Sequence, residues 1–284
     1  MNPAYKSEAG RKAVAAAYAD LLAHWPVPCE SLRVPTRAGE TFVIASGPAA
    51  APPLVLLHGA QTNAASWMFE AAAWSADFRV FAVDVIGEPG LSAPVRLDLE
   101  GEAHALWLDD ILAGLAVARA AFVGVSLGGW LALDYAIRRP GRVEALVLIA
   151  PAGIGPQVNV LAKFWPLLLL GPLGHRRLRD KVLGPPPAKL GADQQRLLDF
   201  LGLAMRHVRP RIVKIPIASG AALAALSMPI LAVLGGQDVL IDTASIRRRL
   251  ADLPTAQVLW LEDAGHFITG QAEAIHRFLK AVRT

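Results

Sequence analysis

The chain has 284 residues, of which 54% are hydrophobic and 18% are charged, and its formal net charge at pH 7 is +4. This length and composition indicate one large globular domain, or one domain with an insertion, and they exclude a disordered chain. No apolar run is long enough to span a membrane, and the charged residues near the N-terminus are unlike a signal peptide. The single cysteine, Cys29, excludes an intrachain disulfide. Together these features lead us to expect a cytoplasmic protein.

Strand-like and helix-like segments alternate along most of the chain. An antiparallel hairpin is expected from 31–35 and 41–46, joined by a short turn with glycine. Most other strand candidates are unbroken apolar runs, which is typical of strands buried on both faces of a parallel sheet. These strands are expected at 54–57, 80–85, 121–125, 143–149, 230–234 and 256–261, and helices near 8–24, 64–76, 102–117, 127–138, 244–252 and 270–282. The pattern predicts an α/β fold with a mainly parallel sheet flanked by helices.

Residues 153–227 interrupt this alternation. About 80 residues of helical and proline-rich sequence separate the strand ending at Ile149 from the strand beginning at Ile230, far more than an ordinary connection needs. We therefore expect a core made of residues 1–152 and 228–284, with residues 153–227 inserted as a helical cap or lid.

The expected cap is basic, with eleven Lys or Arg and only three acidic residues. Solvated polar helix faces explain this charge most simply. The alternative is recognition of an anionic substrate, in which case neutralising Arg176, Arg177 and Arg179 would selectively weaken turnover of anionic esters. No nucleic-acid-binding motif accompanies the basic residues, so a nucleic acid is not an expected partner.

The most informative motif is the stretch from Gly124 to Gly128, which reads Gly-Val-Ser-Leu-Gly. It lies between an apolar strand candidate and a helix candidate. Glycines two positions before and after Ser126 relieve the crowding of a sharp strand-to-helix turn, because they have no Cβ. The pattern is that of a nucleophile elbow, which presents a serine hydroxyl at the edge of a sheet.

A serine nucleophile needs a base, and the base needs an orienting carboxylate. Asp238 follows the strand candidate 230–234, and His266 follows the strand candidate 256–261, so both lie where parallel strands end. Their chain order, serine then acid then histidine, is the order found in hydrolases with this elbow. Asp242 is the alternative acid, although it also suits the N-cap of the helix that follows.

The strand candidate 54–57 leads directly into His58 and Gly59. Acyl transfer requires N–H donors for a developing oxyanion, and we expect these from Ala60, in the loop after this strand, and from Leu127, after the serine. His58 is expected to brace the loop by hydrogen bonds, with a role as base the weaker alternative.

These motifs together resemble the α/β-hydrolase superfamily. The resemblance rests on His58-Gly59, the stretch from Asp84 to Ser92, the elbow, Asp238 and Gly265-His266. It covers nearly the whole chain from about residue 31, and it looks most like cap-bearing bacterial serine esterases. Haloalkane dehalogenases and epoxide hydrolases have aspartate at the position of Ser126, and meta-cleavage C–C hydrolases typically have asparagine at the position of Val125.

The residues and the resemblance predict a serine hydrolase that cleaves a carboxylic ester of a small to medium hydrophobic substrate, with Ser126, His266 and Asp238 as a triad. Gln61 and Trp165 are the candidate substrate contacts, although Gln61 suits a role in bracing the loop equally well. We expect no metal or organic cofactor. The alternatives are thioester, acyl-transfer, perhydrolase or C–C bond chemistry on the same triad, or a ligand-binding receptor without turnover.

Overall fold

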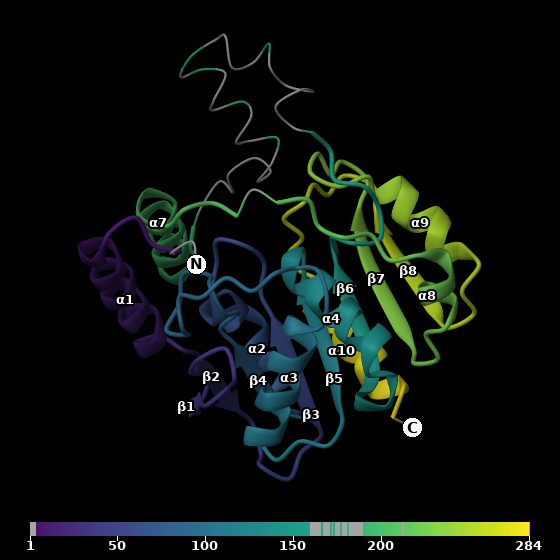
Figure 1. Cartoon of the computed structure of the whole chain (residues 1–284), viewed down its shortest axis with the longest axis horizontal. Helices are drawn as coiled ribbons and strands as arrows, with labels where there is room; N and C mark the ends of the chain where they lie inside the picture. Colours follow the sequence, from purple (N-terminus) through teal and green to yellow (C-terminus); the bar gives the residue numbers. More distant parts are fainter. Residues whose placement is uncertain are drawn as a thin grey trace.

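The computed structural model describes residues 4–159, 166, 171, 173, 177, 181, 190–211 and 213–283. These residues form one sheet with helices on both of its faces (Figure 1). The strands are β1 (Cys29–Val34), β2 (Thr41–Ser46), β3 (Pro53–Leu57), β4 (Arg79–Val83), β5 (Ala120–Val125), β6 (Val143–Ile149), β7 (Ile230–Gly235) and β8 (Ala256–Leu261). The helices are α1 (Glu8–Ala23), α2 (Met68–Trp74), α3 (Ala103–Gly114), α4 (Leu127–Arg138), α7 (Ala192–His207), α8 (Gly220–Ala224), α9 (Thr243–Ala251) and α10 (Ala272–Ala281), with 3-10 turns η1 (Ala64–Trp67) and η2 (Pro140–Arg142).

The strand order in the sheet is β1-β2-β4-β3-β5-β6-β7-β8. The hairpin of β1 and β2 pairs antiparallel, and β2 also runs antiparallel to β4. From β4 to β8 every neighbouring pair is parallel. The expected α/β architecture, with its mainly parallel sheet and edge hairpin, is therefore confirmed, and the carboxyl ends of the six parallel strands from β4 to β8 share one edge of the sheet.

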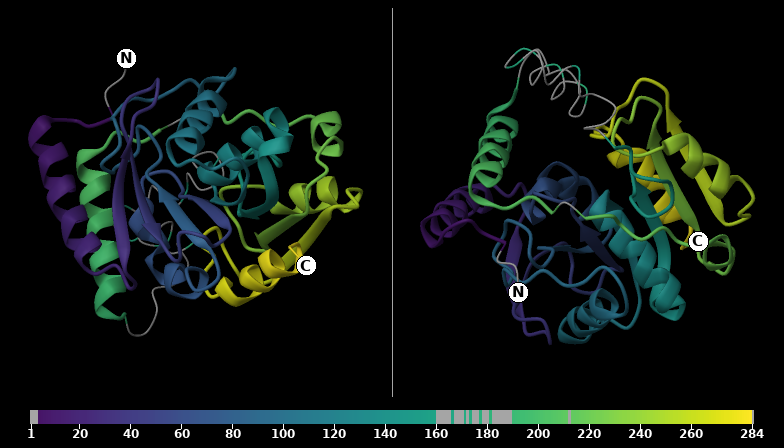
Figure 2. Two further views of the ribbon diagram at one scale, coloured as in Figure 1. Left: turned by 90° about the horizontal axis from the view of Figure 1, so that it is seen from below. Right: turned by 45° about the horizontal axis from the view of Figure 1, so that its top comes forward.

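Both faces of the sheet are covered by hydrophobic layers, which explains why the strands read as continuous apolar runs. In β3, Val55 and Leu57 face one layer, while Leu54 and Leu56 face the other, as the alternation of a strand requires. Helices α3, α4 and α9 contribute to the first layer, and α1, α2 and α10 to the second. Figures 1 and 2 show α3 and α4 on one side of the sheet and α10 on the other.

Two expected elements differ from the structure at the carboxyl edge. The strand expected at 80–85 ends at Val83, because the N–H of Val85 donates to Nε2 of His58 at 2.9 Å instead of continuing the ladder. The helix expected over 64–76 begins as the turn η1 and continues as α2. The side chain of Asn63 caps this turn by accepting a hydrogen bond from the N–H of Ala65.

The N-terminal segment packs against the long connection between β6 and β7. Helix α1 begins after Ser7, whose side chain caps it, and lies beside α7 in both views of Figure 2. Tyr5 pairs with Val208 in an isolated antiparallel bridge, and the N–H of Lys6 donates to the carbonyl of His207 at 2.8 Å. The described part of the connection that includes α7 is thus fastened to residues far away in the sequence.

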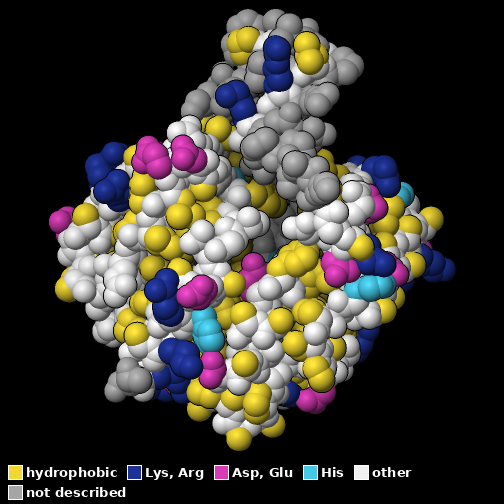
Figure 3. All heavy atoms as spheres, turned by 180° about the vertical axis from the view of Figure 1, so that it is seen from behind, with side chains coloured by type: hydrophobic (Ala, Val, Ile, Leu, Met, Phe, Trp, Pro, Cys, Tyr) yellow, Lys and Arg dark blue, Asp and Glu magenta, His cyan; other side chains and the backbone are white. Residues whose placement is uncertain are grey.

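Charged side chains lie in small groups on one face of the molecule. On the face shown in Figure 3, the Lys and Arg side chains of the described residues form several separate groups. None of the helices in the described ranges is long and apolar enough to cross a membrane.

Candidate active site

Ser126 occupies the sharp turn between β5 and α4. Its backbone has φ 51° and ψ −109°, a left-handed conformation that costs energy for a residue with a Cβ. Backbone hydrogen bonds on both sides of Ser126 stabilise the turn. Its N–H donates to the carbonyl of Ile149, and its carbonyl accepts from the N–H groups of Trp130 and Ala152. The side chain is half-buried and therefore accessible from the carboxyl edge of the sheet.

The glycines around Ser126 are required by close backbone contacts. A Cβ at Gly124 would overlap the carbonyl of Gly128, and a Cβ at Gly128 would overlap the carbonyl oxygen of Leu57 at the end of β3. The strand-to-helix turn can form only because both positions lack side chains. This packing also brings the start of α4 against the loop that follows β3.

His266 lies between Ser126 and Asp238. Its Nε2 is 3.1 Å from Oγ of Ser126, and its Nδ1 is 2.8 Å from Oδ2 of Asp238. A carboxylate can only accept, so Nδ1 carries the proton and Nε2 is free to accept the serine proton. The three residues follow β5, β7 and β8, and the structure brings together the three side chains that the sequence singled out as a triad.

Two glycines at the end of β7 allow the loops carrying the acid and the base to approach each other. A Cβ at Gly235 would overlap the carbonyls of Ala264 and Gly265, and the N–H of Gln237 donates to the carbonyl of Ala264 at 2.9 Å. The sequence analysis assigned no role to Gly235, although a glycine pair one residue short of a candidate acid was the available signal.

The two candidate acids have different surroundings. The Asp238 side chain has no exposed surface, and its Oδ1 accepts hydrogen bonds from the N–H groups of Leu240 and Ile241. These bonds orient Oδ2 toward His266. Asp242 instead accepts from the N–H of Ser245 and is the N-cap of α9. Asp238 is therefore the aspartate that faces the histidine.

Two backbone N–H groups beside Ser126 are not engaged. Neither the N–H of Ala60 nor that of Leu127 has an acceptor within the described chain. Leu127 is the first residue of α4, where the N–H groups of a helix have no intrahelical acceptor. A Cβ built on Gly59, the residue before Ala60, would lie 3.7 Å from Cβ of Ser126, so the loop after β3 runs past the serine.

His58 is buried in the same loop and is engaged at both ring nitrogens. Because Nε2 accepts the N–H of Val85, the proton of the neutral ring is on Nδ1, which donates to the carbonyl of Gly59 at 2.8 Å. Burial lowers the pKa of His58 to about 4. With both nitrogens bound to the backbone, this ring connects the loop after β3 to the end of β4 and has no free nitrogen for Ser126.

Gln61 follows Ala60 and points toward the long connection. Its backbone has φ 62°, its N–H donates to Oε2 of Glu88 at 2.8 Å, and its side-chain Nε2 reaches the carbonyl of Arg209 at 3.4 Å. The other candidate substrate contact, Trp165, lies outside the described residues. Glu88 received no role from the sequence, even though an acidic residue inside a glycine-rich turn was visible there.

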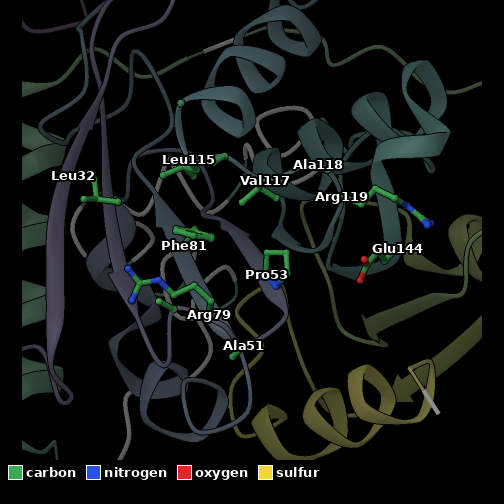
Figure 4. A pocket seen from close by; sticks show the side chains of 13 residues that line it. Leu32, Ala51, Pro53, Arg79, Phe81, Leu115, Val117, Ala118, Arg119 and Glu144 are labelled. Carbon is green, nitrogen blue, oxygen red and sulfur yellow. The ribbon is translucent and has the colours of Figure 1, made fainter.

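A separate hollow lies on the opposite edge of the sheet (Figure 4). This cavity of about 650 Å³ is lined by residues at the amino ends of β3, β4 and β6 and in the loop before β5, among them Pro53, Arg79 and Glu144. Arg79 is paired with Glu30, and Glu144 with Arg283. Because Ser126, Asp238 and His266 follow carboxyl ends of strands, this hollow is no part of their site.

The elbow, the strand order and the arrangement of the three side chains define the class of this protein. A model of the alpha/beta hydrolase family matches residues 54–278. The chain belongs to this family.

Among individual proteins, the chain is similar to two carboxylesterases of Bacillus subtilis. It is 41% identical over 135 residues to the uncharacterized carboxylesterase nap and 42% identical over 136 residues to carboxylesterase YbfK. Each match covers 48% of this chain. The matched stretch spans a little under half the length of these relatives, 45% of the first and 46% of the second. The crystal structure of naproxen esterase from Bacillus subtilis is 29% identical, with a TM-score of 0.80 over 95% of this chain and 96% of that chain.

Proposed function

We propose that the protein is a serine hydrolase that cleaves carboxylic esters. The observation that carries this proposal is the continuous contact from Asp238 through His266 to Ser126, next to two backbone N–H groups that have no acceptor among the described residues. A hydroxyl becomes a nucleophile when an oriented base takes its proton, and a tetrahedral intermediate forms when nearby donors stabilise its oxyanion. Similarity to the carboxylesterases supports the same reaction class.

In the proposed mechanism, Nε2 of His266 takes the proton of Ser126 while Oγ attacks the ester carbonyl carbon. Asp238 holds the imidazole and stabilises the imidazolium that forms. The N–H groups of Ala60 and Leu127 donate to the oxyanion of the tetrahedral intermediate. His266 then gives its proton to the leaving alkoxide, and a water molecule activated by the same imidazole hydrolyses the acyl-enzyme.

A hydrophobic substrate of small to medium size agrees with the side chains near this edge. Phe267 directly follows His266 and is 48% exposed, and its ring centroid lies 6.1 Å from that of the histidine. Exposed aromatic surface beside a catalytic base favours an apolar acyl or alcohol group, because binding removes that surface from water. We further propose that residues 153–227 cap the site, with Trp165 as one of the substrate contacts.

The test is active-site labelling with a fluorophosphonate probe, followed by mass mapping, on the wild type and on Ser126→Ala. We expect labelling at Ser126 alone, its loss in the variant, and hydrolysis of short p-nitrophenyl esters by the wild type. Ser31→Ala, at an exposed position on β1, serves as the control and is expected to keep both properties. A folded wild type that is neither labelled nor active would remove the proposal and favour a ligand-binding role.

A further inference from the structure

The carboxylate of Glu88 connects the loop after β3 to the segment that follows α7. Glu88 is only 1% exposed, and its Oε2 accepts the N–H of Gln61 at 2.8 Å. Gln61 has a left-handed backbone, which a residue with a side chain adopts only when its surroundings hold it there. Because Gln61 follows Ala60 directly, fixing the peptide between them also restricts the direction of the Ala60 N–H.

The counter-charge of Glu88 comes from the connection between β6 and β7. Nε of Arg211 lies 3.5 Å from Oε1 of Glu88, and the Arg211 side chain is 5% exposed. Neither of these two atoms makes a hydrogen bond within the described chain. Burial raises the pKa of Glu88 and lowers that of Arg211, and the opposite charge of each partner counteracts this. An isolated buried carboxylate would be costly, and the guanidinium of Arg211 beside Glu88 reduces that cost.

Further contacts tie the same two segments together. The carbonyl of Arg209 accepts from Nε2 of Gln61 and from the guanidinium of Arg96. Arg96 also donates to the carbonyl of Gly87, the residue before Glu88. The loop from His58 to Thr62, which we call the oxyanion loop, is thereby attached to residues 209–211 by side chains that are all distinct from the triad.

We propose that Glu88 is a positioning residue for ester hydrolysis: it holds the Gln61 N–H so that the neighbouring Ala60 N–H points at the forming oxyanion, and Arg211 supplies its buried counter-charge. This inference rests on the esterase activity proposed above. A displacement of about 1 Å in a catalytic group lowers rates by about 100-fold, so an unanchored loop should impair kcat far more than substrate binding.

The test compares Glu88→Ala and Glu88→Gln with Glu100→Gln, an exposed control. We expect Glu88→Ala to lower kcat for a p-nitrophenyl ester about 100-fold with KM within about threefold. It should weaken a trifluoromethyl ketone, which forms a tetrahedral adduct with the serine, by a similar factor and leave the matching plain ketone unaffected. Glu88→Gln keeps an oxygen acceptor for Gln61 and should restore most of kcat. If Glu88→Ala does not fold, Glu88→Ala/Arg211→Met removes both buried charges and takes its place.

Hydrogen exchange of the peptide spanning residues 59–62 tests the anchor without turnover, and it should be faster in Glu88→Ala than in the wild type. Unchanged exchange, an unchanged kcat, or a Glu88→Gln enzyme as impaired as Glu88→Ala would overturn the inference while the esterase proposal stands. If the wild type hydrolyses no ester, the proposed function fails and Glu88 has no catalytic loop to position, whereas faster exchange would still report the anchor itself.

Discussion

His266 and Asp238 form a pair in which each partner has one defined orientation. Nδ1 of His266 faces Oδ2 at 2.8 Å, while Oδ1 is held by the N–H groups of Leu240 and Ile241. The carboxylate therefore cannot rotate without losing two backbone hydrogen bonds. An imidazole held in this way keeps its proton on Nδ1 and presents Nε2 to Ser126.

Replacing the carboxylate of Asp238 should lower activity far more than replacing that of Asp242, four residues later. In Asp238→Asn, an amide N–H can face the imidazole and favour the wrong tautomer, so we expect kcat to fall by about 10³–10⁴. Asp242→Asn keeps an N-cap side chain on α9 and should retain kcat within about twofold. Ester turnover and thermal unfolding of both variants check this. Equal losses in the two variants would contradict the assignment of the acid.

The close packing around the turn between β5 and α4 predicts that one added methyl group at Gly128 strongly destabilises the protein. A Cβ at Gly128 would overlap the backbone of Leu57 and His58, which cannot move without disturbing the end of β3. Gly128→Ala should therefore lower the free energy of unfolding by about 3 kcal/mol or more. Gly202→Ala is the matched control, because it lies inside α7 with open space around it, and it should raise stability by about 0.5–1 kcal/mol. Urea denaturation measures both, and a Gly128→Ala protein as stable as the wild type would disprove the steric argument.

The sequence carried enough information for the fold and for the three side chains, because each has a local signature. Apolar runs such as 143–149 have the length of buried strands, and Ser126, Asp238 and His266 each follow one of them. Contacts between segments far apart in the chain could not be predicted from the sequence. The pairing of Glu88 with Arg211 depends on where the long connection returns to the sheet, and no local pattern records that position.

The same limit applies to hydrogen bonds that end a strand. Val85 is apolar and follows β4 after one intervening residue, Asp84, and the sequence pattern predicts it as a strand residue. Its N–H instead donates to His58, which sits at the end of a different strand. Whether a backbone N–H joins the ladder or meets a side chain is decided by tertiary packing, which periodicity does not encode.

Acid should destabilise the protein through His58. Its pKa is lowered by burial to about 4 in the folded state against 6.5 in the unfolded chain, so between these values the unfolded chain binds more protons. Stability from this residue is complete above the unfolded value and is lost as the pH falls, by about 2 kcal/mol between pH 7.5 and pH 5. In His58→Gln, the deficit in unfolding free energy relative to the wild type should shrink by that amount over this range. Denaturant unfolding at the two pH values measures it, and a deficit independent of pH would contradict the assigned shift.

Tyr18 and Asp84 provide a test in which the pH dependence has the opposite sign. The hydroxyl of Tyr18, on α1, donates to Oδ1 of Asp84 at 2.8 Å, and both side chains are buried. Burial raises the pKa of Asp84 to about 6, so the folded state binds the extra proton between pH 3.8 and that value, and its contribution to stability decreases as the pH rises through this window.

Tyr18→Phe removes a hydrogen bond to a carboxylate that is ionised at pH 7.5 and mostly protonated at pH 5. We expect a loss of about 1.5–3 kcal/mol in unfolding free energy at pH 7.5 and a smaller loss at pH 5. Ester turnover should stay within about twofold, because Asp84 keeps the N–H groups of Ala64 and Leu91 as donors. Unfolding and turnover at both pH values check this, with Tyr135→Phe, whose hydroxyl donates to the half-buried Asp109, as the comparison. An equal loss at the two pH values would show that Asp84 remains ionised at pH 5 and would contradict its raised pKa.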